Sequence, residues 1–207
     1  MKAIVDYGVV NLFSLASSFG YIGEQAKLTS DAEEIRASDR IILPGVGAFA
    51  DAAKKLEESG LAAVVCSEAR AGKPLLGICL GMQMLFERSC EYGEHKGLGL
   101  IKGSVKPMRD VIPAELKIPQ IGWNALKFHG EKSPLFKYIN EGDFVYFVHS
   151  YYGADCEDSL IATAEYGADI TAAVASDNVY GTQFHPEKSG EVGLSILRAF
   201  CEIGGRE

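Results

Sequence analysis

The feature that most constrains this chain is a short apolar run that stops at a cysteine between two glycines. Residues 74–78 favour a buried strand, and the letters Gly77-Ile78-Cys79-Leu80-Gly81 lead from it into a helical pattern. This is the layout of a nucleophile elbow, a sharp strand-to-helix turn that exposes the nucleophile, with cysteine in place of serine. The first helical turn would favour a thiolate and offer free N–H groups to an oxyanion. A buried structural cysteine before an ordinary turn is the alternative.

A second segment, more than a hundred residues later, carries the groups that a cysteine nucleophile needs. A β-favouring run ends at His185, and Glu187 follows two residues on. A base must take the thiol proton and later pass it to the leaving group, and a carboxylate must hold the ring of that base. Side chains at i and i+2 leave an extended segment on the same face. We therefore predict a triad of Cys79, His185 and Glu187. A strand-end histidine that is satisfied by solvent is the alternative.

The pattern of apolar residues predicts an α/β fold. Strands are expected over residues 3–5, 40–43 and 74–78, and helices over residues 12–19, 51–58 and 61–71. Asn11 is a candidate N-cap, and Asp31 with Glu34 has the spacing of a capping box. Strands then dominate until a last helix over residues 191–201; the expected strands are 102–105, 124–127, 144–149, 160–164, 171–175 and 180–184.

Alternation of strand and helix predicts a mostly parallel central sheet with helices on both faces, in a three-layer α/β arrangement. The β-rich second half would extend this sheet and add a small antiparallel layer. We see no linker in the sequence and predict one domain over residues 1–207.

Composition excludes several classes of function. The chain has 207 residues, 47% of them hydrophobic, and a net charge of -8 without a cluster of Lys and Arg, which argues against nucleic-acid binding. No apolar stretch reaches the roughly 20 residues of a membrane helix. Five cysteines without framework spacing suggest free thiols in a reducing cytoplasm. No His or Cys spacing suggests a metal site, and we expect no cofactor.

The motifs in their order resemble a known family. Beside Gly-Ile-Cys-Leu-Gly-Met-Gln and Gln-Phe-His-Pro-Glu, the chain contains Pro44-Gly45-Val46-Gly47, Gly122-Trp123-Asn124 and His149-Ser150-Tyr151. Together they resemble the class I (triad) glutamine amidotransferases, and among these the glutaminase subunits of imidazole glycerol phosphate synthase. The resemblance implies the glutamine amidotransferase fold and hydrolysis of glutamine to glutamate and ammonia. It also implies ammonia transfer to a cyclase subunit, a (β/α)₈ barrel, in histidine biosynthesis.

The same resemblance implies roles for further residues of the site. Backbone N–H groups near Val46, Gly47 and Leu80 would form the oxyanion hole; without the resemblance, residues 44–47 read as an ordinary turn. Gln83 and Glu91 would bind glutamine, with Glu91 on its ammonium and Glu94 as a rival. The segment of His149, Ser150 and Tyr151 would hold the substrate carboxylate.

A partner surface is implied at Asn11, Trp123 and Lys188. From the residues alone, Trp123 is equally a core or surface aromatic, and Lys188 an exposed lysine. The chain departs from the family at Val10, often Gly, and at Pro119-Gln120-Ile121, where the family often has Pro-His-Met. These departures concern the interface and leave the triad unchanged.

Three other functions stay open. In the first, the chain is the glutaminase subunit of a paralogous synthase, such as one of surface-sugar biosynthesis. In the second, it is another Cys-His-Glu hydrolase, such as a γ-glutamyl peptidase. The third possibility is a catalytically silent subunit that only regulates a partner.

Overall fold

The central element is a nine-stranded sheet in the order β2-β1-β3-β4-β13-β12-β11-β8-β9. The structure is a computed structural model that describes residues 1–8 and 12–204. Neighbours from β2 to β13 pair in parallel, and the pairings from β13 to β9 are antiparallel. The parallel strands are β1 (Lys2–Val5), β2 (Ala26–Thr29), β3 (Arg40–Leu43), β4 (Leu75–Ile78) and β13 (Val179–Thr182). The antiparallel part consists of β8 (Gln120–Phe128), β9 (Phe144–His149), β11 (Leu160–Glu165) and β12 (Asp169–Ser176).

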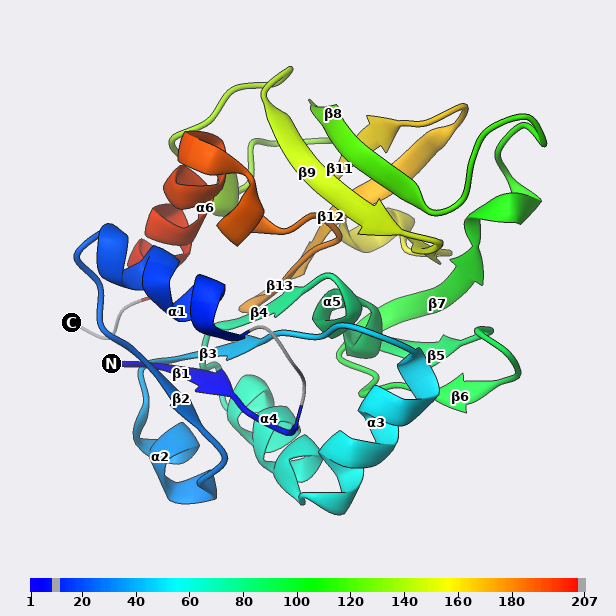
Figure 1. The fold of residues 1–207 in the computed structure, drawn as a ribbon. Helices are drawn as coiled ribbons and strands as arrows, with labels where there is room; N and C mark the ends of the chain where they lie inside the picture. Colours follow the sequence, from blue (N-terminus) through cyan, green and yellow to red (C-terminus); the bar gives the residue numbers. More distant parts are fainter. Residues whose placement is uncertain (9–11, 205–207) are drawn as a thin grey trace.

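Helices cover both faces of the parallel part, which makes the predicted three layers (Figure 1). On one face lie α1 (Leu12–Tyr21) and α6 (Gly190–Glu202), whose Phe19 and Phe200 belong to the same buried apolar cluster as Ile42 of β3. On the other face lie α2 (Ala32–Ala37), α3 (Phe49–Glu58) and α4 (Leu61–Arg70). Strands β1, β3 and β4 are buried along their whole length, as expected for parallel strands with helices on both faces.

A second, four-stranded sheet, β10-β7-β5-β6, lies beside the central one (Figure 1). Its strands are β5 (Phe86–Ser89), β6 (His95–Lys96), β7 (Ile101–Pro107) and β10 (Tyr151–Ala154). The chain passes between the two sheets at two places that matter below. One is the short helix α5 (Leu80–Leu85) between β4 and β5, and the other is Ser150 between β9 and β10.

The predicted elements are found, with differences at their edges and in the second sheet. Strands β2, β5, β6 and β10 were not among the predicted segments, because they are short and lack clean alternation. The helix after the elbow has only six residues. The capping box is half formed: Asp31 caps α2 through the N–H groups of Glu33 and Glu34, but the Glu34 carboxylate binds Lys27 instead. Asn11 and Val10 lie outside the described residues.

Within the described part of the chain, no helix has the length and apolar character needed to span a membrane.

Candidate active site

Cys79 occupies a strained turn between β4 and α5. Its φ of 54° and ψ of -111° lie in a region that non-glycine residues rarely adopt. The turn is held by close backbone packing, because a Cβ atom on Gly81 would lie 1.8 Å from the Leu43 carbonyl oxygen. The Cys79 N–H also donates to the Thr182 carbonyl oxygen at 2.7 Å. This is the elbow geometry that the sequence predicted.

Three neighbouring strands bring the predicted motifs together. β3, β4 and β13 lie side by side and parallel, and their carboxyl ends lead into residues 44–47, into Cys79 and toward His185. Ligands of α/β proteins bind at this edge of a parallel sheet. A cavity of about 620 Å³ opens here. Its lining includes most of the predicted site residues: Val46, Gly47, Cys79, Leu80, Gln83, Glu91, His149, Ser150, Tyr151, His185 and Lys188.

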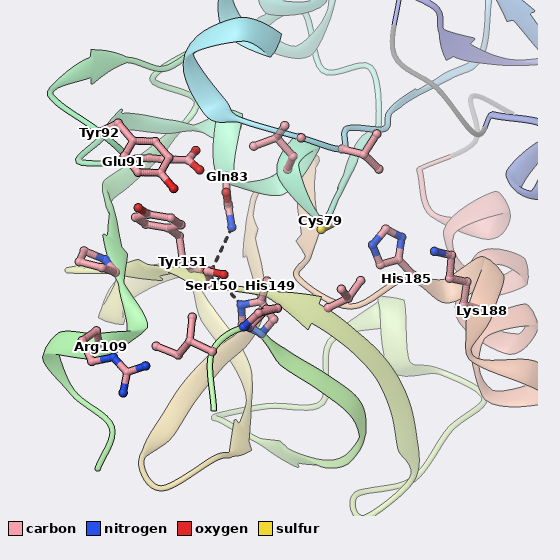
Figure 2. Close-up of a pocket in the computed structure, with 17 residues that line it drawn as sticks. Cys79, Gln83, Glu91, Tyr92, Arg109, His149, Ser150, Tyr151, His185 and Lys188 are labelled. Atoms are coloured by element: carbon pink, nitrogen blue, oxygen red, sulfur yellow. Dashed lines mark hydrogen bonds between the residues drawn. The ribbon is translucent and has the colours of Figure 1, made fainter. Parts of the chain in front are cut away.

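His185 faces Cys79 across the edge of this cavity (Figure 2). Its Nδ1 contacts Glu187 Oε1 at 2.8 Å, and both side chains are more than nine-tenths buried. Burial lowers the pKa of His185, but hydrogen bonds to Cys79 and Glu187 outweigh it and raise the pKa to about 9. At neutral pH the ring is therefore a cation between two partners. This arrangement places a proton donor beside the Cys79 sulfur.

His149, the other histidine in the cavity, has the opposite character. Its Nδ1 contacts the Tyr151 carbonyl oxygen at 2.8 Å, and its Nε2 is buried without a partner among the described residues. Burial lowers the pKa of His149 to about 4, against the hydrogen bond to Tyr151. The ring is neutral at pH 7 and carries no charge for a substrate carboxylate. If the segment of residues 149–151 binds a substrate carboxylate, the donors are therefore its main-chain N–H groups and the Ser150 side chain.

Gln183 had no predicted role, yet the Gln183 side chain contacts the predicted nucleophile, Cys79. Gln183 Nε2 donates to Cys79 Sγ at 3.7 Å, and the residue is fully buried. The available signal was its spacing, because Gln183 precedes His185 by two residues and an extended segment turns both side chains to one side. Gln183 is thus a second donor that contacts the Cys79 sulfur.

The orientation of Gln183 is fixed through Gln83. Gln83 Nε2 donates to the Tyr151 carbonyl oxygen and to Gln183 Oε1, both at 3.0 Å. A backbone carbonyl only accepts hydrogen bonds, so the Gln83 amide nitrogen must face Tyr151, and the Gln183 amide nitrogen is left facing Cys79. Both N–H donors of Gln83 are used. Toward the cavity Gln83 offers only its oxygen, which suits a cation.

Replacing Gln183 by leucine is expected to slow alkylation of Cys79 by iodoacetamide at neutral pH by about tenfold. The reason is that a lost hydrogen bond is worth roughly 0.5–1.5 kcal/mol, and about 1.4 kcal/mol corresponds to tenfold. Alkylation rates measure the reactivity of the Cys79 sulfur, and mass spectrometry separates Cys79 from the other thiols. Thr182→Ser, a neighbouring buried change, serves as the control. An unchanged alkylation rate in Gln183→Leu would show that this contact does not affect the reactivity of Cys79.

Opposite His185, the far end of the cavity carries Glu91, Tyr92 and Tyr151 (Figure 2). The rings of Tyr92 and Tyr151 meet edge to face, with centroids 6.3 Å apart. Tyr92 and Arg109 also line the cavity, and neither had a predicted role. Neither position shows a distinctive spacing in the sequence. Glu94, the rival of Glu91, does not line the cavity and pairs with Arg88 at 3.8 Å.

Of the predicted partner residues in the described part of the chain, Lys188 lines the cavity and Trp123 lies on β8. The Trp123 side chain is 51% exposed and meets the ring of Tyr146 edge to face at 6.0 Å between centroids. On the other side, Lys188 Nζ lies 5.9 Å from the centroid of the same ring. Exposed Ile121 and Phe144 are on the same two strands, β8 and β9. We call Ile121, Trp123, Phe144 and Tyr146 the β8–β9 apolar surface.

Comparison with known proteins gives the family. The model of the family "Glutamine amidotransferase class-I" matches residues 3–203. The chain belongs to the class I glutamine amidotransferases. Two full-length relatives are named "Imidazole glycerol phosphate synthase subunit HisH". The protein of Caldanaerobacter subterraneus subsp. tengcongensis is 48% identical over 98% of both chains. That of Wolinella succinogenes is 47% identical over 99% of this chain and all of its own.

Solved structures agree on the fold of this amidotransferase. A structure described as a glutamine amidotransferase superposes with a TM-score of 0.74, 19% identity and coverage of 96% of this chain and 98% of that one. PurLQS from Thermotoga maritima gives a TM-score of 0.73 with 20% identity and coverage of 97% and 96%. The predicted fold class is therefore confirmed.

Proposed function

We propose that this chain is the glutaminase subunit of an imidazole glycerol phosphate synthase. The observation that carries the proposal is the contact of a raised-pKa histidine with both a strained elbow cysteine and a buried carboxylate. Close relatives named as subunits of that synthase support the choice of pathway. The reaction is hydrolysis of the glutamine side-chain amide, with ammonia delivered to a cyclase partner in histidine biosynthesis. The setting is the cytoplasm, and no cofactor takes part.

The chemistry follows from the geometry. Cys79 attacks the amide carbon of glutamine, and the C–N bond breaks as protonated His185 gives its proton to the departing ammonia. His185 then takes a proton from water, whose oxygen attacks the thioester and releases glutamate. Glu187 holds the ring through Nδ1 in both steps. The Leu80 N–H, the first of α5, has no intrahelical acceptor and faces the oxyanion together with N–H groups of the segment at Val46 and Gly47.

The polar groups of the cavity suggest how glutamine lies in it. Its amide end meets Cys79 and His185, and its amino-acid end extends toward Glu91 and Tyr151 (Figure 2). The Gln83 oxygen and the Glu91 carboxylate accept from the α-ammonium. Main-chain N–H groups around Ser150 and Tyr151 donate to the α-carboxylate.

The proposed cyclase, a (β/α)₈ barrel that forms a heterodimer with this chain, sits over the β8–β9 apolar surface and Lys188. An exposed tryptophan with neighbouring aromatic and apolar groups is a typical interface anchor. The main-chain N–H of His185 donates to the Tyr146 carbonyl oxygen at 3.0 Å. A hydrogen bond therefore joins this surface directly to the residue that acts as the base. Ammonia would leave beside this surface into the partner. The role of Asn11 stays a prediction.

The other functions are less well supported. A silent regulatory subunit would have no need for the strained elbow, which costs of order 1–3 kcal/mol of backbone strain. A paralogous synthase shares the chemistry and differs only in the partner. Reconstitution with the candidate cyclase, followed by glutamine-dependent formation of imidazole glycerol phosphate, tests the proposal and separates these functions.

We expect the isolated chain to be a poor glutaminase. Gly47 follows Val46 and has a φ of +94°, so residues 44–48, which we call the oxyanion segment, have access to more than one peptide orientation. Partner binding can bias that choice, and a missing oxyanion donor costs on the order of 10²–10³ in rate. Steady-state glutamine hydrolysis by the chain alone, with the cyclase, and with the cyclase plus an acceptor analogue should show activation of at least this order, mostly in kcat. Full activity of the chain alone would contradict a gated oxyanion segment.

A further inference from the structure

Glu91 reaches out of its turn to hold the start of helix α3. Its Oε2 accepts from the Phe49 N–H at 2.6 Å, across 42 residues of sequence. The N-cap residue of α3 is Ala48, whose methyl group cannot cap the helix. A carboxylate is stabilising at a helix N-terminus, because the N–H groups of the first turn have no acceptors within the helix. Glu91 therefore supplies from a distance the acceptor that the local sequence lacks.

This contact lies at one end of the oxyanion segment, residues 44–48. The other end is held at Pro44, whose carbonyl oxygen accepts from the Tyr7 hydroxyl at 2.7 Å. Between the two anchors lies Gly47, at a φ of +94°, where glycine allows the backbone to rotate. Gly45 is closely packed instead, because a Cβ atom there would lie 2.8 Å from the Gly81 nitrogen. Val46 and Gly47 line the same cavity as Cys79 and Glu91. The position of the Glu91 carboxylate thus bears directly on where the segment presents its N–H groups.

We propose that Glu91 is a positioning residue for the oxyanion segment as well as the acceptor for the substrate α-ammonium. This rests on the proposed glutaminase function. One carboxylate oxygen is used by Phe49, and a carboxylate can accept at both of its oxygens. The other oxygen remains for the cavity side. Binding of the amino-acid end of glutamine and the geometry of the oxyanion hole are thereby coupled through a single side chain.

Two variants and an altered substrate separate the two roles. Glutaramate is glutamine without its α-amino group, so its hydrolysis needs no acceptor for an ammonium. Glu91→Gln keeps an oxygen for the Phe49 N–H but loses the charge, and Glu91→Ala loses both. In the complex with the cyclase, kcat/KM for glutamine should fall in both variants. With glutaramate as substrate, kcat/KM of Glu91→Gln should stay within about threefold of the value for the natural protein. The kcat/KM of Glu91→Ala should fall at least about tenfold, mostly through kcat. A complete loss of one oxyanion donor would lower the rate further.

Hydrogen exchange of the Phe49 amide gives an independent measurement. The amide should be protected in the natural protein and in Glu91→Gln, and should exchange faster in Glu91→Ala. Glu94→Ala, in the same turn but outside the cavity, is the matched control and should change neither quantity.

Equal glutaramate turnover in all three proteins, or unchanged protection of Phe49 in Glu91→Ala, would overturn the positioning role. Either result would leave Glu91 as an ammonium acceptor only. A failure of the glutaminase proposal is distinguishable, because the natural protein would then hydrolyse neither substrate in the complex.

Discussion

Replacing Cys79 by alanine is expected to abolish glutamine-dependent synthesis by the complex while leaving synthesis from free ammonia intact. The thiol is the nucleophile that the elbow presents. Alanine removes the sulfur atom but keeps the Cβ atom, so the backbone of the turn is not crowded by the change. We expect the proposed cyclase to use ammonia from solution whether or not this chain produces it. Both reactions are measured on the same reconstituted complex, so the ammonia-dependent rate reports folding and assembly.

A matched control is Cys201→Ala. Cys201 has the same exposed fraction as Cys79, 8%, but it lies on α6 and does not line the cavity. Its replacement should reduce stability by at most a few kcal/mol and leave glutamine turnover unchanged. Near-normal glutaminase activity in Cys79→Ala would exclude Cys79 as the nucleophile.

His185→Ala is expected to reduce glutamine hydrolysis by about 10²–10⁴, and Glu187→Gln by less. Without Glu187 the imidazole can still carry a proton, although its ring is less well held. Single-turnover hydrolysis in the complex measures the two losses. Small and equal losses would place the base elsewhere. His149 is the other histidine of the cavity, but its Nδ1 is engaged by Tyr151 and its Nε2 is buried without a partner in the described structure.

The pH dependence follows from the raised pKa of His185. Its protonated form is needed to release ammonia, and its pKa of about 9 keeps that form present at neutral pH and removes it as the pH rises through 9. Glutamine hydrolysis should therefore fall on the alkaline side near pH 9. In Glu187→Gln, the loss of a favourable partner should move this fall to lower pH. A shift to higher pH would contradict the assigned contact.

Much of the fold was predictable because it rests on local patterns. The buried strands β1, β3 and β4 are continuous apolar runs, and the helices α1 and α3 have one apolar face. The second sheet was less predictable: β6 has two residues and β10 four, too short to show a period. The capping box failed in its second half because Glu34 found a better partner in Lys27 on the adjacent strand.

The sequence by itself determined the chemistry of the site: a cysteine in an elbow, a histidine with a carboxylate two residues on, and glycines where backbones must approach closely. Spacing along one chain is enough for these, because each is a local arrangement. Only the tertiary structure decided which groups meet. The pairing of β4 with β13 places His185 beside Cys79. The contacts of Gln183 with Cys79 and of Glu91 with Phe49 span 104 and 42 residues. No local pattern records such contacts, since they depend on how the strands and turns pack.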